Sequence, residues 1–139
     1  MFAFIIISII VLFFVVFSGL SKPIESTNTT YQKVYNIDLT PFSHHEEVEV
    51  VGVHLEENFG YILNFVKPRH PVKIIPEPDN KYSERALKVV HEDFCIGYIS
   101  ENDIDLIVPL INQNHLCLIG AVDMQGSYLY VSVKVYFKE

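Results

Sequence analysis

The run Pro76–Asn80 (Pro-Glu-Pro-Asp-Asn) precedes the residues best suited to binding chemistry in this sequence. Proline lacks a backbone N–H, and Asp and Asn bond their own backbone, so an extended strand has to end here. Lys81 and then Tyr82 follow. Tyr82 is expected on the turn, where its ring could stack on a flat ligand, and Lys81 is a neighbouring cation. The alternative is that the Tyr82 ring packs over the turn and fixes the strand register. The sequence leaves both interpretations open.

No group of residues has the pattern of a catalytic site. The stretch Ser43–Glu47 holds a hydroxyl, two imidazoles and two carboxylates, but adjacency in sequence is not the geometry of a triad. His91 could share a strand face with Cys95, and His115 with Cys117, yet the Cys-x-x-Cys pair typical of zinc sites is absent. The chain also lacks a glycine-rich phosphate loop. We therefore predict a protein that is not an enzyme and needs neither a metal nor a cofactor.

The charge balance argues against indiscriminate binding to nucleic acid. The chain carries 10 Lys and Arg against 17 Asp and Glu, a formal net charge of −7 at pH 7. Nucleic-acid affinity comes largely from cations that neutralise phosphates. The only dense basic cluster is Lys67–His70 with Lys73, which is expected to be a solvated loop.

The first twenty residues are almost entirely apolar and uncharged, unlike the rest of the chain. Phe2–Phe17 is apolar apart from Ser8, and about twenty such residues suffice for a bilayer-spanning helix. A cleaved signal peptide is the alternative, although no basic residue precedes the apolar run. We predict a single-pass membrane anchor at 1–21, a polar tether at 22–45 and a domain at 46–139. Lys22 favours a cytoplasmic domain.

Apolar alternation predicts the strands of the domain. They are Glu47–Leu55, Val72–Ile75, Ala86–His91, Phe94–Ile99, His115–Val122 and Tyr128–Phe137. Helical spacing predicts one helix at Asn58–Val66 and another after Ser100, which would cap it, with Pro109 as a defect inside the second. The predicted fold class is mainly β: a small antiparallel β-barrel with one or two short helices, preceded by the transmembrane helix.

The order of several motifs resembles the HIRAN domain, a β-rich module of helicase-like DNA remodellers that also occurs alone in bacteria. The resemblance is carried by Glu77–Tyr82, Ala86–Val89 and Ile96–Ile99, together with the opening strand Val50–Val53. It covers about residues 47 to 137. It implies a barrel of the OB/SH3-like kind, related to small nucleic-acid-binding barrels.

The resemblance also implies a binding pocket. In DNA-binding HIRAN domains, rings stack on the bases of a free single-strand end, basic residues hold phosphates and a carboxylate receives the terminal hydroxyl. Tyr82 matches the stacking tyrosine, and His54 falls where those members carry a basic residue. Lys81 is a further charge nearby. Tyr128 or Tyr130 is the candidate for an opposing ring, although packing on the sheet is the competing role for both.

Three positions depart from the family pattern. Ser83 stands where the hydroxyl-binding Asp is expected, Leu55 replaces an aromatic residue, and Glu101 lies near a usual Lys. A serine can still hydrogen-bond a hydroxyl, whereas Glu101 would repel phosphate.

We therefore predict a membrane-anchored, non-catalytic HIRAN-like module that binds a single-stranded DNA end. The competing prediction is a protein-interaction module at the membrane that no longer binds nucleic acid. A hydrolase or metal site at His44 and His45 is a third, weaker hypothesis.

Overall fold

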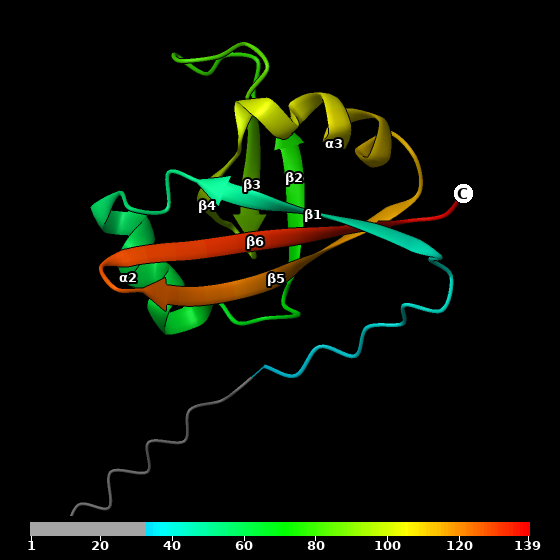
Figure 1. Ribbon diagram of the computed structural model, residues 1–139, viewed down its shortest axis with the longest axis horizontal. Helices are drawn as coiled ribbons and strands as arrows, with labels where there is room; N and C mark the ends of the chain where they lie inside the picture. Colours follow the sequence, from blue (N-terminus) through cyan, green and yellow to red (C-terminus); the bar gives the residue numbers. More distant parts are fainter. Residues whose placement is uncertain (1–32) are drawn as a thin grey trace, which may run out of the picture. The chain divides into compact units, whose positions relative to one another are not determined.

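Six antiparallel strands close into a barrel in the order β1-β4-β3-β2-β5-β6 (Figure 1). The computed structural model describes residues 33–139, and Val34–Glu139 form one compact unit. The strands are β1 (His44–Val51), β2 (Pro71–Pro76), β3 (Leu87–His91), β4 (Phe94–Ile99), β5 (His115–Gln125) and β6 (Tyr128–Phe137). The predicted mainly β barrel is confirmed.

Two short α-helices and one 3-10 turn complete the unit. They are α2 (Glu56–Phe65), η1 (Glu101–Asp103) and α3 (Ile104–Ile111). Ser100 occupies the predicted capping position before η1, but its side chain makes no capping hydrogen bond. Pro109 lies inside α3, which ends two residues later. This agrees with the missing N–H of proline, which removes a bond from the helix ladder.

The described residues contain no helix that is long and apolar enough to cross a bilayer. The predicted anchor at 1–21 lies outside the described part of the chain, as do residues 22–32 of the predicted tether. The last two tether positions, His44 and His45, belong to β1.

The apolar residues that alternate along the strands point into the barrel and form its core. Val48 and Val50 of β1 point inward and are buried, whereas Val51 is 39% exposed. The predicted strand to Leu55 is too long because the chain turns at Gly52, whose φ of +78° suits glycine. The interior is filled mainly by β-branched side chains, which favour strands.

The segment before β1 packs on the barrel. The Tyr35 ring lies edge-on to His70 with centroids 4.9 Å apart, and its hydroxyl donates to the Glu92 carboxylate at 2.8 Å. Val34, by contrast, is 89% exposed. Leu39 of the same segment also lies against barrel residues, among them Leu118 and Tyr136.

His91 is buried. Its Nδ1 lies 3.0 Å from the Tyr61 hydroxyl and its Nε2 lies 2.9 Å from Nδ1 of His70. The Cys95 thiol contacts the carbonyl of Gly97 instead of a histidine. Residues 33–139 contain no cluster of three or more potential metal ligands among His, Cys, Asp and Glu.

Candidate functional site

The connection between β2 and β3, residues 77–86, forms a rigid corner at the end of the barrel that also carries α3 (Figure 1). The Asn80 side-chain oxygen accepts the backbone N–H groups of Tyr82 at 2.9 Å and Ser83 at 3.3 Å. The base of the corner is closed by the Glu77 N–H, which donates to the Ala86 carbonyl at 2.8 Å. This is an Asx-type turn, and it fixes the direction in which residue 82 leaves the backbone.

Tyr82 is 85% exposed. The only ring contact that it makes in the described chain is with Lys81, whose Nζ lies 4.9 Å from the ring centroid. The ring therefore does not pack over the turn, and it contributes little apolar burial to folding. A flat ligand could stack on the face of the ring that Lys81 does not cover.

Glu77 ties the corner to the barrel. Its carboxylate accepts hydrogen bonds from the Asn80 amide at 2.7 Å and the Tyr98 hydroxyl at 2.9 Å, and Lys88 Nζ lies 3.7 Å away. These groups, the Asn80 amide first, lower the pKa of Glu77. Burial, followed by the bond to Glu77, raises the pKa of Tyr98 to about 12. At neutral pH the tyrosine therefore donates and the carboxylate accepts.

The lowered pKa of Glu77 predicts that the corner becomes less stable when this carboxylate is protonated at acidic pH. Because the folded state favours the carboxylate, this contribution to stability is full above the ordinary Glu pKa of 4.5 and is lost as the pH falls further. We expect the free energy of unfolding to fall more steeply below pH 4.5 in the wild type than in Glu77→Gln. Chemical denaturation over this pH range measures it, and parallel profiles for the two proteins would contradict it.

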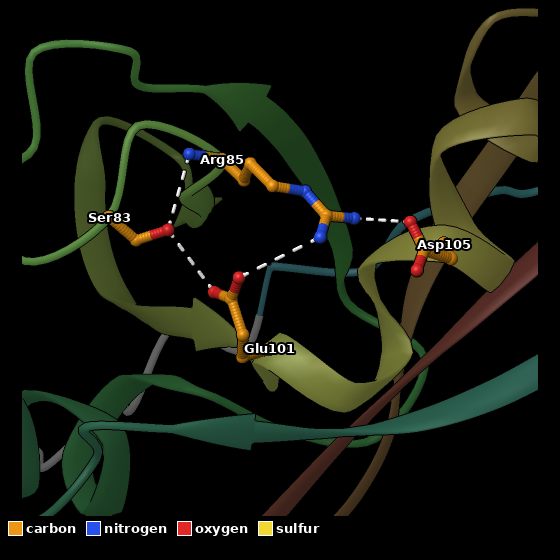
Figure 2. Close-up of polar contacts among 4 residues, drawn as sticks. All are labelled: Ser83, Arg85, Glu101 and Asp105. Carbon is orange, nitrogen blue, oxygen red and sulfur yellow. Dashed lines mark hydrogen bonds and ion pairs between the residues drawn. The ribbon is translucent and has the colours of Figure 1, made fainter.

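The far side of the corner is bonded to the η1–α3 segment (Figure 2). The Ser83 hydroxyl donates to Glu101 Oε2 at 3.2 Å and accepts the backbone N–H of Arg85 at 3.2 Å. Arg85 Nη1 lies 4.0 Å from Glu101 Oε1, and the Arg85 guanidinium also pairs with Asp105. A carboxylate thus lies directly beside position 83, although residue 83 itself is a serine.

His54 and Tyr128 come together at a second place. Their ring centroids are 4.5 Å apart at an interplanar angle of 44°. The Tyr128 hydroxyl donates to Glu49 Oε1 at 2.5 Å, and this bond raises the pKa of Tyr128. The pair lies where β1 ends and β6 begins, so the chain segments around 54 and 128 are neighbours although they are far apart in sequence.

Tyr98 connects the corner to the end of β1. Tyr98 bonds Glu77 at the base of the corner and is paired in the ladder with Val51, the last residue of β1. Within residues 33–139, no hydrogen bond or ring contact joins Tyr82 directly to His54 or Tyr128. Leu55, the position of a missing aromatic residue, is 64% exposed.

Arg85 is the residue of the corner that sequence reasoning missed. An arginine in a turn usually lies on a solvated surface, so its residue type alone does not indicate a site. Its sequence position, three residues after Tyr82, was a usable signal. Its partners on α3 and η1 could not be known without the topology.

The stretch around Ser43 forms a small surface contact. The Ser43 hydroxyl lies 2.8 Å from His44 Nδ1, and His44 Nε2 lies 3.8 Å from the Glu139 carboxylate. All three residues are exposed. Water therefore competes for each of these groups.

Comparison with protein families gives a match to the HIRAN domain over residues 44–139. This chain belongs to the HIRAN domain family. HIRAN domains are known as DNA-binding modules. The matched range starts at the first residue of β1 and includes the whole 77–86 corner.

A solved structure shares the fold of this HIRAN domain. It is a crystal structure of a protein from Lactobacillus plantarum, a structural genomics target, with a TM-score of 0.51 and 19% sequence identity. The match covers 66% of this chain and 92% of that one. Comparison with curated protein sequences gave no match.

Proposed function

We propose that this HIRAN domain is a non-enzymatic module that binds the end of a DNA single strand at the 77–86 corner. The observation that carries the proposal is the Tyr82 ring, which is 85% exposed on a backbone held in place by Asn80. An exposed ring on a rigid turn gains little from folding. Stacked against a base, such a ring contributes about 1–3 kcal/mol.

Glu101 is the proposed acceptor of the strand's terminal hydroxyl. Its carboxylate lies 3.2 Å from the Ser83 hydroxyl, so η1 supplies in space the carboxylate that position 83 lacks in sequence. The side chain is 59% exposed and therefore accessible. A carboxylate offers about four lone-pair positions, and one bond from Ser83 leaves the others for a ligand.

The cations have distinct roles in this proposal. Lys81 Nζ lies over the Tyr82 ring, 4.9 Å from its centroid, and is suited to the nearest phosphate. Arg85 offsets the charge of Glu101 and Asp105, which reduces their repulsion of the strand. His54, packed on Tyr128, is proposed to contact the strand further from its end.

Fluorescence anisotropy with the full-length protein in neutral detergent tests the proposal. A labelled short single strand with a 3′-hydroxyl should bind at low salt, where phosphate contacts are strongest, and more tightly than the same strand with a 3′-phosphate. No binding at low salt would remove the proposal.

Substitution of Glu101 gives a sharper prediction. In Glu101→Gln we expect the preference for the hydroxyl end over the phosphate end to fall by about tenfold, because a charge-assisted hydrogen bond is lost and a repulsion is relieved. Asp105→Asn is the matched control, since it removes a carboxylate of the same cluster that does not contact Ser83. If Glu101→Gln strengthens both complexes equally, Glu101 only repels phosphate.

The second candidate function is a protein-interaction module. Residues 77–88 and 101–105 together hold six carboxylates and three basic side chains, a balance that suits a basic protein surface better than a polyanion. A pull-down from membranes with the full-length chain, with both protein and nucleic acid identified, separates the two. Recovery of a partner protein without nucleic acid, lost in Tyr82→Ala, would favour this candidate.

We further propose that the predicted anchor at residues 1–21 tethers the domain to a membrane by a single pass, with the domain in the cytoplasm. The support is its length and lack of charge, with Lys22 on the C-terminal flank. Protease protection of the domain in sealed vesicles of known orientation tests the side on which it lies.

A further inference from the structure

A hollow of about 180 Å³ lies on the outer face of the barrel, beside the irregular part of the β5–β6 ladder. Its floor is apolar, formed by Leu118 and Ile119 with Leu39 from the segment before β1. Arg69, Lys134 and Tyr136 give it a polar rim. Arg69 precedes the start of β2, whereas the 77–86 corner follows the end of that strand, so the hollow and the corner are separate sites.

Glu47 limits the charge of the hollow. Position 120 is a glycine, and a Cβ there would lie 2.5 Å from Glu47 Oε1 and 2.6 Å from the Ser132 hydroxyl. Without that Cβ, the Glu47 carboxylate lies against the β5 backbone and accepts the Ser132 hydroxyl at 2.6 Å. Its other oxygen lies 3.7 Å from Lys134 Nζ. One of the two cations is therefore already partly neutralised.

Arg69 is held in an unusual backbone conformation at the rim. Its φ is +70°, in the left-handed region that residues other than glycine rarely adopt. Two backbone hydrogen bonds fix it, from the Arg69 N–H to the Ile119 carbonyl and from the Ile119 N–H to the His70 carbonyl, both 2.8 Å. No carboxylate among residues 33–139 forms an ion pair with its guanidinium.

We propose that this hollow binds a small organic carboxylate. Arg69 and Lys134 carry two positive charges, and Glu47 carries one negative charge, so the net charge at the hollow is +1. A monoanion neutralises this charge, whereas a phosphate dianion would leave an excess of negative charge. The planar guanidinium fork matches a carboxylate in two parallel hydrogen bonds. Leu118 and Tyr136 would contact the apolar part of the ligand. The volume of the hollow is below that of pockets for drug-sized ligands, so this apolar part has to be small.

Titration of the full-length protein in neutral detergent, followed by NMR, tests this assignment. The probes are benzoate, its uncharged analogue benzamide, and inorganic phosphate. Benzoate is expected to shift the backbone signals of Gly120 and Arg69, benzamide to leave them in place, and phosphate to bind more weakly than benzoate. Equal responses to benzoate and benzamide, or tighter binding of phosphate, would overturn the proposal.

Substitutions locate the site. Arg69→Gln should weaken benzoate binding by about tenfold, the effect of losing a charge-assisted pair of hydrogen bonds. Lys134→Gln should have a smaller effect because Glu47 already pairs with Lys134. Lys73→Gln is the matched control: Lys73 is an exposed cation of β2 that does not line the hollow. Unchanged affinity in Arg69→Gln, with strand binding intact, would reject this site without touching the proposed function.

Discussion

Replacement of Tyr82 by alanine is expected to weaken single-strand binding by about 5- to 150-fold, the loss of one stacked base at about 1–3 kcal/mol. Because the ring is 85% exposed, the same substitution should leave the free energy of unfolding within about 0.5 kcal/mol of the wild type. Anisotropy titration and chemical denaturation of one protein preparation measure both quantities. A binding loss accompanied by a large loss of stability would point to a structural role for the ring.

Tyr82→Phe is the control for this prediction. Phenylalanine keeps the aromatic face and removes only the hydroxyl, so binding close to that of the wild type is expected. If Tyr82→Phe binds as poorly as Tyr82→Ala, a hydrogen bond from the hydroxyl carries the affinity and stacking does not.

Gly97→Ala is expected to be the most damaging substitution for the fold. A Cβ at residue 97 would lie 2.4 Å from the Val51 carbonyl oxygen and 2.8 Å from Val50 Cγ1. The first of these is backbone, so β1 and β4 have to separate for the side chain to fit. Overpacking of this kind costs about 1–3 kcal/mol and sometimes more. Denaturant unfolding measures the loss, and strand binding should fall with it because Val51 is paired with Tyr98.

Gly60→Ala is the matched control for Gly97→Ala. No atom lies within 4 Å of a Cβ at residue 60, which is inside α2. Alanine is favoured over glycine in a helix by about 0.8–1.0 kcal/mol, so this variant should be as stable as the wild type or more stable. Equal stability of the two alanine variants would mean that the close approach at Gly97 is not needed.

The sequence predicted the strands well because one face of each is buried. Alternation of apolar residues located Phe94–Ile99 and Tyr128–Phe137 to the residue and the other strands to within a few residues. The prediction failed where a backbone conformation ended the strand without a change in apolarity. Val53 continues the apolar pattern after β1, but Gly52 has already turned the chain.

Only those features of the site that depend on neighbouring residues in the sequence could be predicted. The Pro and Asn residues around 80 predicted a turn that carries Tyr82, since those effects act within a few residues, but they left open whether its ring packs over the turn. The contacts of Ser83 with Glu101 and of His54 with Tyr128 join segments that only the barrel closure brings together. For this reason Glu101 counted in sequence only as a departure from the family pattern, and its contact with Ser83 is seen only in the folded chain.

The end of a DNA single strand is proposed to bind at the corner formed by residues 77–86 and η1. NMR mapping of the full-length protein with a short single strand ending in a 3′-hydroxyl tests it most directly. We expect the largest shifts at the backbone amides of Tyr82, Ser83 and Glu101, with smaller shifts near His54. Shifts confined to the basic segment Lys67–Lys73, with the corner unchanged, would contradict the account.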